Sequence, residues 1–329
     1  MHQAYRNEIA IGRPGALGGG QWHLSNLSTI TAIFGKNGSG KSLLLRALRD
    51  ADLNSRHYVV PERTGELDYH PTYLQQQLDP QQRREHSARN YTDQYRRQIV
   101  ARIQAYFAAR GNTRGEQLPG RPEELEAFLL QLLPDFGTEL SGTKNPPYSI
   151  IRSSSGQLIS NIDQLSSGEA QLLTIALDIL TISAIWDIEG RAERLMLIDE
   201  PDAHIHPDLQ ARFADFLVQV TARYKLQVLF ATHSTSLLAA IGQFAGPDAS
   251  VIYFDRLKEV FRAERFSDVM KELAACLGGH ALMGPLFGVP LLLVEGDDDF
   301  RIWSQVPRYH AVIFAVIPSN GDQINQYQR

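Results

Sequence analysis

The sequence has little cysteine, no long apolar run and no large excess of either charge. Its 329 residues include one cysteine, Cys276, which cannot form a disulfide within the chain and does not fit a cysteine-rich metal site. A small apolar filler in a helical stretch is its expected role. The longest apolar run, Leu172 to Trp186, is interrupted by Asp178 and falls short of the roughly 20 residues that cross a bilayer. We therefore expect a cytoplasmic protein without a membrane span.

The charges nearly balance. With 37 acidic and 32 basic side chains the formal net charge is −5, so bulk charge does not predict binding to nucleic acid, and any such contact must be local. Hydrophobic residues make up 43% of the chain and charged residues 21%, while the 25 glycines and 16 prolines follow no fixed period. This composition excludes collagen-like and wholly disordered classes and predicts a globular protein.

Several apolar runs have the pattern of buried parallel strands, because each is nearly continuous and ends at a turn signal. A helical pattern begins at Pro207 and separates two of these runs. Strands that alternate with helices in this way predict an α/β fold with a parallel sheet. The predicted strands are Ile30 to Phe34, Leu195 to Ile198, Leu226 to Ala231, Val251 to Phe254 and, near the C-terminus, Pro290 to Val294.

The strongest motif directly follows the first of these strands and precedes the helical Leu43 to Leu48. It matches the P-loop pattern GxxxxGK[ST], in which glycines let backbone N–H groups close around phosphate oxygens at a helix N-terminus. Lys41 is expected to reach the β- and γ-phosphates, and the Ser42 hydroxyl to ligate Mg²⁺. The motif therefore predicts ATP and Mg²⁺ as cofactors, bound by Gly35, Asn37, Gly38, Ser39, Gly40, Lys41 and Ser42.

A second element places two carboxylates at the end of the apolar strand Leu195 to Ile198. Asp199 is predicted to hold the magnesium, through water, and Glu200 to act as the general base on the attacking water. Acidic residues after a strand are also common helix caps, so this pattern alone leaves both roles open. Together with the P-loop it favours the catalytic role.

Two further motifs resemble those of the ABC-type ATPases, the class that includes transporter ATPase subunits and the SMC, Rad50 and RecF proteins. Leu165-Ser166-Ser167-Gly168-Glu169 is similar to that family's LSGGQ signature, and Ala231-Thr232-His233-Ser234 looks like its switch histidine. The resemblance implies an ABC-type P-loop ATPase head.

The same resemblance implies a homo-oligomer, at least a dimer, with composite ATP sites. In that family the signature, here Ser166, Ser167, Gly168 and Glu169, contacts the nucleotide of the opposite protomer, and the histidine, here His233, acts at the γ-phosphate. Without the family, Ser166 or Ser167 is an N-cap for the helix that follows. The glutamine of the family's Q-loop is not resolved among Gln75, Gln76 and Gln77.

The run from Asp199 to Pro207 resembles the "DEPE, two or three residues, LHP" run of ATPases grouped with the OLD nucleases, including the PARIS kind that acts in anti-phage defence. It departs from that run by Asp202 in place of Glu and by Ile205 in place of Leu. His204 and His206 are expected to be structural, or part of a dimer interface, because two histidines with no third ligand do not predict zinc.

The segment from Leu291 to Phe300 looks like the first strand and turn of a TOPRIM domain, which OLD-type proteins carry after their ATPase. The resemblance implies that Glu295 serves acid/base or metal chemistry in phosphodiester cleavage, with Asp299 as the acidic residue that follows. The alternative is that these acidic residues only cap a helix. No Asp-x-Asp pair follows Phe300, so we expect either a piece of a longer ATPase–TOPRIM fusion or a degenerate nuclease half, and no DNA cleavage by this chain alone.

These motifs predict an ATPase domain at residues 1–285, with a helical insertion at 71–135, and the start of a TOPRIM-like domain, truncated, at 286–329. Arginine is concentrated in the insertion, where residues 81–115 hold eight arginines against Glu85 and Asp93, with three tyrosines between them. This pattern suits nucleic acid or a phage protein, or else only a solvated helical face. The residues are Arg83, Arg84, Arg89, Arg96, Arg97, Arg102, Arg110 and Arg114, with Tyr91, Tyr95 and Tyr106.

The expected function is an ATPase that dimerises on ATP and regulates a TOPRIM-type nuclease effector, in cis or in trans, in prokaryotic antiviral defence. One alternative is a DNA-repair or chromosome-maintenance ATPase of the RecF or Rad50 kind, in which DNA stimulates ATP hydrolysis through Arg96 and Arg97. A transporter subunit is the other alternative, and the Glu-Gly motif at Glu295 argues against it.

Overall fold

The computed structural model describes residues 5–15, 19–35, 38–52, 55–59, 78, 95–112, 119–159, 164–203, 205–266, 291–294, 298–299, 302–303 and 315–318. The strands are β1 (Ile9–Gly12), β2 (Gln21–Ser25), β3 (Ile30–Phe34), β4 (Arg56–Val59), β5 (Phe136–Leu140), β6 (Tyr148–Arg152), β7 (Leu158–Ile159), β8 (Leu195–Asp199), β9 (Gln227–Thr232), β10 (Ala249–Tyr253), β11 (Val260–Arg262), β12 (Glu264–Arg265), β13 (Leu291–Val294) and β14 (Ala315–Pro318). The helices are α1 (Lys41–Ala51), α4 (Tyr95–Asn112), α5 (Pro122–Leu132), α6 (Ser167–Ile188), α7 (Pro207–Tyr224), α8 (Thr235–Ala245) and the short 3₁₀ helix η3 (Gly246–Asp248).

A six-stranded sheet forms the centre of the molecule, in the order β12-β10-β3-β9-β8-β4. Every neighbouring pair from β10 to β4 is parallel, and only β12 runs antiparallel to its neighbour. The predicted α/β fold with a parallel sheet is therefore confirmed, and the predicted strands correspond to β3, β8, β9, β10 and β13 within a few residues.

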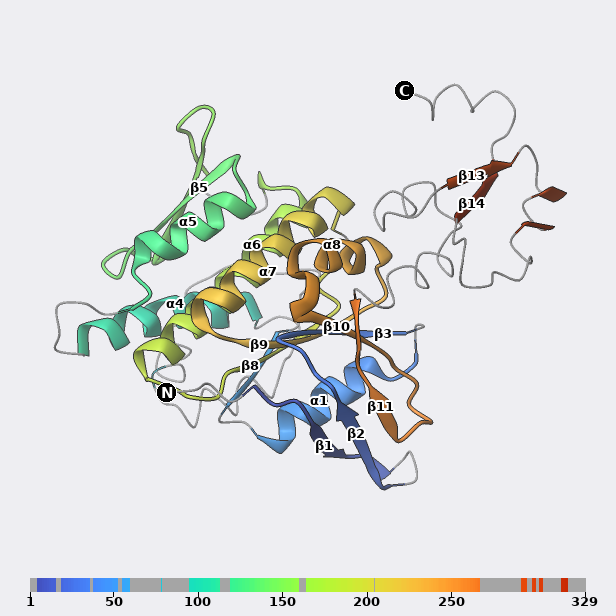
Figure 1. Ribbon diagram of the computed structural model, residues 1–329. Helices are drawn as coiled ribbons and strands as arrows, with labels where there is room; N and C mark the ends of the chain where they lie inside the picture. Colours follow the sequence, from blue (N-terminus) through green and yellow to red (C-terminus); the bar gives the residue numbers. More distant parts are fainter. Residues whose placement is uncertain are drawn as a thin grey trace.

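The sheet is buried on both faces, which is why its strands are continuously apolar. One face is covered by α1 and by the three-stranded sheet β1-β2-β11, and Trp22, Ile33 and Leu44 belong to the core on that side (Figure 1). The other face is covered by the layer of α4, α6, α7 and α8, where Ala32 and Met196 belong to a larger core. Successive strand residues thus contact different layers.

Helix α6 passes through the middle of the helical layer. It is apolar on all sides, as a helix surrounded by other elements must be, and most of its residues are buried. Among the described helices, α6 is the one that is long and apolar enough to cross a membrane. However, 89% of its apolar stretch is buried inside the fold. It is therefore a core helix.

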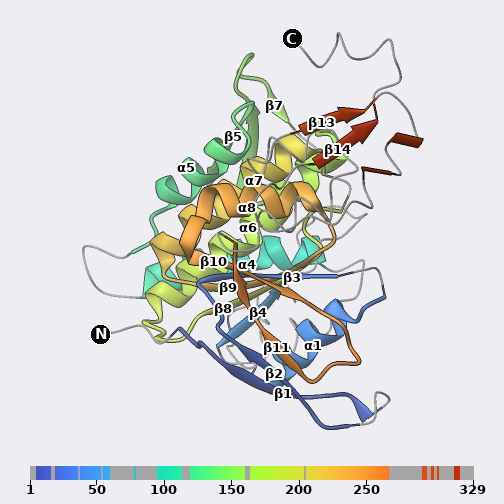
Figure 2. The same cartoon turned by 45° about the vertical axis from the view of Figure 1, so that its right-hand side comes forward.

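The predicted helical insertion contains α4 and α5 in its described part, and its boundaries at 71 and 135 stay a prediction. The glycines and prolines between Gly137 and Pro147 are typical of a loop, but the segment begins within a strand, because β5 pairs with β6 and packs on α5 (Figure 2). The strand is a half-buried one, with Phe136, Thr138 and Leu140 facing inward and Gly137 and Glu139 outward. Five residues that mix polar and apolar side chains with a glycine do not predict a strand from sequence.

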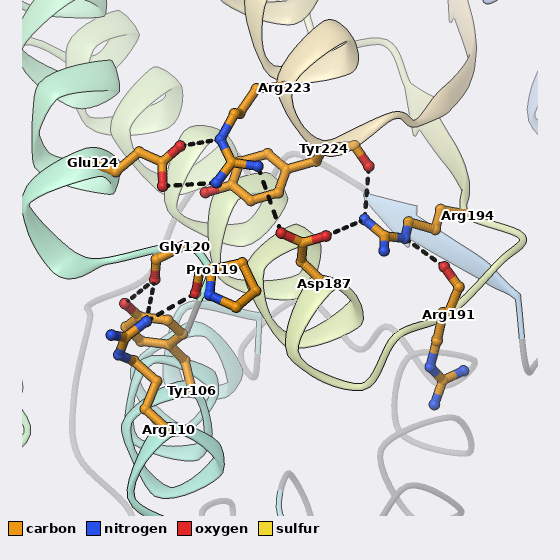
Figure 3. Close-up of polar contacts among 10 residues, drawn as sticks. All are labelled: Tyr106, Arg110, Pro119, Gly120, Glu124, Asp187, Arg191, Arg194, Arg223 and Tyr224. Carbon is orange, nitrogen blue, oxygen red and sulfur yellow. Dashed lines mark hydrogen bonds and ion pairs between the residues drawn. The ribbon is translucent and has the colours of Figure 1, made fainter. Parts of the chain in front are cut away.

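Ion pairs and hydrogen bonds link α7 to both α5 and α6, and they link α4 to the residues that precede α5 (Figure 3). Asp187 at the end of α6 accepts from Arg194 at 2.8 Å and faces Arg223 of α7 at 3.5 Å, and Arg223 in turn grips Glu124 of α5 through two nitrogens. On α4, the Tyr106 hydroxyl donates to the Gly120 carbonyl at 2.6 Å. The insertion is thereby fixed to the core.

The packing of these helices buries part of the arginine-rich segment. Arg102 and Tyr106 are buried, so the prediction of a solvent-facing surface is wrong for these two residues. They turn inward because α4 packs along α6, where Arg102 meets Asp178. Arg110 donates to the carbonyls of Pro119 and Gly120 and thereby serves the connection between α4 and α5.

At the C-terminal end, β13 and β14 form a parallel two-stranded pair in which Leu291 lies opposite Ala315. Parallel strands need a crossover connection, as in a βα unit, and cannot be joined by a tight hairpin. Asp299 is exposed on a short helical segment, and Glu295 lies outside the described residues.

Candidate functional site

The predicted catalytic residues gather at one edge of the central sheet. The P-loop begins at Gly35 after β3, Asp199 and Glu200 stand at the end of β8, and His233 follows β9, which lies between the other two strands. Since these strands are parallel, their carboxyl ends meet at the same edge, where α/β sheets bind ligands. The sequence order of the motifs therefore becomes spatial proximity through the strand order alone.

Two glycines of the P-loop are required for different reasons, one for its backbone conformation and one for lack of space. Gly40 is the N-cap of α1 with φ of 96°, a left-handed conformation that side chains rarely adopt. At Gly35, a Cβ atom would lie 2.7 Å from the Phe254 carbonyl oxygen, so only glycine fits against the end of β10. The chain that follows β10 also contacts the loop at Arg256, whose backbone N–H donates to the Ser39 carbonyl at 3.0 Å. Asn37 lies outside the described residues.

Lys41 and Ser42, the first residues of α1, face the loop and the second motif. The Lys41 side chain is buried, and its Nζ donates to the Gly35 carbonyl at 2.9 Å across the loop. The Ser42 hydroxyl donates to Asp199 Oδ1 at 3.0 Å, which joins the two nucleotide motifs directly. A serine hydroxyl beside a carboxylate, at a loop shaped for phosphate, is the oxygen donor set that suits Mg²⁺ with a nucleotide. The residues present therefore fit the cofactors that the sequence predicts.

A tyrosine that the motifs do not include completes the surroundings of Asp199. The Tyr58 hydroxyl, from β4, donates to Asp199 Oδ2 at 2.7 Å. Burial raises the pKa of the Asp199 carboxyl, and the hydrogen bonds from Tyr58 and Ser42 oppose that shift. Burial likewise raises the pKa of Tyr58 above its usual value of about 10, so the phenol stays protonated and remains a donor.

Glu200 and His233 lie next to each other at this edge. His233 Nδ1 is 3.7 Å from Glu200 Oε1, and both side chains are partly open to solvent, at 44% and 32% exposure. Glu200 has φ of 47°, a conformation unusual for a residue with a side chain, and its N–H is held by the Ala231 carbonyl at 2.9 Å. Such strain concentrates at functional sites, where the surrounding structure enforces it. The geometry thus presents a carboxylate and an imidazole to one small region in front of the sheet.

The residues beside His233 are tied to the loop that follows Glu200. Thr232 donates to the buried Asp202 at 2.6 Å and accepts the Ser234 N–H at 2.9 Å. Ser234 caps α8 and donates to Gln210 of α7 at 2.6 Å. Burial raises the pKa of the Asp202 carboxyl, and the bond from Thr232 opposes the shift. His233 is therefore held between two residues whose side chains are fixed.

The signature residues form the start of α6. Ser166 is its N-cap in a capping box, in which the Ser166 hydroxyl accepts the Glu169 N–H at 3.4 Å and Glu169 Oε2 accepts the Ser166 N–H at 2.8 Å. Ser167 is exposed and Gly168 is buried. A capping function and contact with a partner's nucleotide are compatible, and the second stays a prediction.

The remaining predicted residues divide into two groups. His206 is the N-cap of α7 and accepts the Asp208 N–H at 3.4 Å, which agrees with a structural role. The candidates Gln75, Gln76 and Gln77, together with His204 and Glu295, lie outside the described residues. Tyr58 and Gln210 belong to none of the sequence motifs, and no local signal marks them, because each acts through a partner far away in the chain.

Comparison with known proteins gives a family match and several distant structural similarities. Residues 62–239, more than half of the chain, match the family model described as "AAA domain, putative AbiEii toxin, Type IV TA system"; the P-loop precedes the matched residues. No curated protein matches the sequence.

Three solved structures illustrate the similarities. "Crystal structure of the SmcHead bound to the C-winged helix domain of ScpA" is 15% identical over 77% of this chain and 95% of that one, with a TM-score of 0.45. "An inward-facing conformation of a putative metal-chelate type ABC transporter" is 15% identical over 86% and 90%, with a TM-score of 0.43. "RNase-L Inhibitor" is 14% identical over 84% and 43%, with a TM-score of 0.42.

Proposed function

This chain belongs to the ATPase family described as "AAA domain, putative AbiEii toxin, Type IV TA system", and on that premise we propose that it is an ABC-type head that binds ATP with Mg²⁺, dimerises on it and hydrolyses it. The observation that carries the proposal is the hydrogen bond of 3.0 Å between Ser42 and Asp199, with Glu200 and His233 beside it. Two distant motifs meet there in the geometry that a metal–nucleotide complex needs.

The chemistry divides among these residues. Lys41 and the loop amides bind and orient the phosphates, Glu200 takes the proton of the attacking water, and His233 is placed to contact the terminal phosphate. Ser42 and Asp199 would hold Mg²⁺, which would supply positive charge that neutralises the phosphates. Ser167 and Gly168 at the start of α6 offer a partner's nucleotide a helix N-terminus, which favours anions.

Replacing Lys41 tests nucleotide binding. Lys41→Ala removes the cation that faces the loop, and the loss of one or two charge-assisted hydrogen bonds to phosphate weakens binding by about 10- to 100-fold. We expect the Kd for a fluorescent ATP analogue to rise by that factor and phosphate release to fall to background. Lys144→Ala is the matched control, because Lys144 is an exposed lysine on the β5–β6 connection. Wild-type affinity in Lys41→Ala would show that the nucleotide is bound elsewhere.

The finer proposal is that ATP turnover regulates a TOPRIM-type nuclease effector in antiviral defence. Its support is the sequence from Leu291 to Phe300 and the parallel pairing of β13 with β14. DNA recognition through residues 81–115 has less support than the sequence suggested, since Arg102 and Tyr106 are buried.

The nuclease part of this proposal predicts an inactive chain. We expect no nicking of supercoiled DNA by the protein alone with ATP and Mg²⁺, because no Asp-x-Asp pair follows Phe300 to hold the metal. Agarose gels of plasmid DNA give the measurement, with Glu295→Gln as the comparison. Nicking by the wild type that disappears in Glu295→Gln would instead mean that a complete nuclease site lies within these residues.

A further inference from the structure

Tyr58 holds the metal-binding carboxylate from a side that neither nucleotide motif supplies. Its hydroxyl occupies Asp199 Oδ2 at 2.7 Å, while Ser42 occupies Oδ1 at 3.0 Å. The two donors come from different elements, β4 and α1. With both oxygens engaged, the carboxylate has one orientation, in which Oδ1 points to the hydroxyl expected on the metal.

The phenol itself is fixed. Tyr58 is only 4% exposed and belongs to the core that includes Leu44, Leu45 and Leu48 of α1. The guanidinium of Arg49 lies over its ring, 5.3 Å from the centroid. A buried ring has few alternative rotamers, so the packing around it keeps the hydroxyl pointed at Asp199.

The strand behind the phenol is fixed as well. Successive residues of a strand point to opposite faces, and His57, next to Tyr58, lies on the helical side, where its Nε2 is 2.9 Å from Asp178 of α6. In the sheet, Tyr58 lies opposite Leu197, two residues before Asp199. Strand β4 is thus held from both faces at the residue that contacts the carboxylate.

We infer that Tyr58 is a positioning residue for the Mg²⁺ of the ATP site, acting by holding Asp199 in the orientation that receives the ion. The inference rests on the proposed ATP-binding function. Groups that orient a metal ligand commonly change metal affinity by about 10- to 100-fold when they are removed. Tyr58 belongs to none of the nucleotide motifs, so it adds a determinant that the pattern of glycines and carboxylates does not contain.

The test is Tyr58→Phe, which keeps the ring and removes the hydroxyl. The Kd for a fluorescent ATP analogue is measured across a Mg²⁺ titration and again in EDTA. We expect the Mg²⁺ concentration for half-maximal tightening to rise by about 10-fold, and the affinity in EDTA to stay within about two-fold of the wild type. Tyr58→Met is a second variant without the hydroxyl, with an adaptable side chain, in case the phenylalanine protein does not fold.

Tyr106→Phe is the matched control. It also removes a buried phenol that donates at 2.6 Å, but to the Gly120 carbonyl among the helices of Figure 3. Both variants are expected to melt at a lower temperature, and only the Tyr58 variants to need more Mg²⁺. An unchanged Mg²⁺ requirement in folded Tyr58→Phe or Tyr58→Met overturns the inference and leaves the proposed function intact. A wild type that binds no ATP, or binds it without regard to Mg²⁺, overturns both.

Discussion

Glu200→Gln is expected to lower ATP turnover by at least about 100-fold while leaving ATP affinity within a few-fold of the wild type. Glutamine keeps the size of the side chain and a hydrogen-bonding oxygen but cannot take the proton of the attacking water. The backbone of Glu200, held at φ of 47° by the Ala231 carbonyl, does not depend on the carboxylate. The substitution therefore separates hydrolysis from binding.

The same variant tests dimerisation. If each ATP lies between Lys41 of one protomer and Ser167 of the other, a protein that cannot hydrolyse ATP accumulates as the ATP-bound dimer. Light scattering after gel filtration with ATP and Mg²⁺ gives the mass, and release of inorganic phosphate gives the turnover. Glu139→Gln is the control, because Glu139 is an exposed carboxylate on β5 paired with Lys144. Wild-type turnover in Glu200→Gln would mean that another group is the base.

The nucleotide site was largely predictable because its signals are local. Gly35 to Ser42 occupy eight consecutive positions, and the strands that carry the motifs are continuous apolar runs, since both faces of the sheet are covered. Once the motif-bearing strands are parallel neighbours, their ends must converge. Fold class and the gathering of Lys41, Asp199 and His233 follow from that geometry.

Other parts could not be predicted, because their meaning depends on distant partners. Strand β4 has the sequence Arg-His-Tyr-Val, which is too polar and too short to indicate a buried strand. Tyr58 meets Asp199 across 141 positions and His57 meets Asp178 across 121. Arg102 lies in an arginine-rich segment, which predicts an exposed side chain. In the structure it is buried, because Asp178 of α6 provides a buried carboxylate that it contacts. A charged residue in a sequence predicts an exposed side chain only where the folded core contains no oppositely charged partner for it.

Asp178→Ala is expected to lower the free energy of unfolding by about 3–5 kcal/mol, the range for removing one partner of a buried ion pair. Asp178 has no exposure in the middle of α6 and lies between Arg102 of α4 and His57 of β4, both buried. Without the carboxylate, the buried Arg102 guanidinium loses the charged partner that it faces on α6. Urea denaturation followed by circular dichroism gives the midpoint and slope from which the free energy is obtained.

A double-mutant cycle shows whether the cost comes from the charge of Arg102. Arg102→Met replaces the guanidinium by an apolar side chain of similar length, so the double variant Asp178→Ala with Arg102→Met lacks both members of this buried ion pair. We expect it to be more stable than Asp178→Ala alone, whereas additive losses would mean that packing, not charge, sets the cost. Lys144→Ala breaks an exposed pair with Glu139, at 52% and 57% exposure, and is expected to cost less than about 1 kcal/mol. The contrast follows from solvent, which screens the exposed pair and is absent around Asp178.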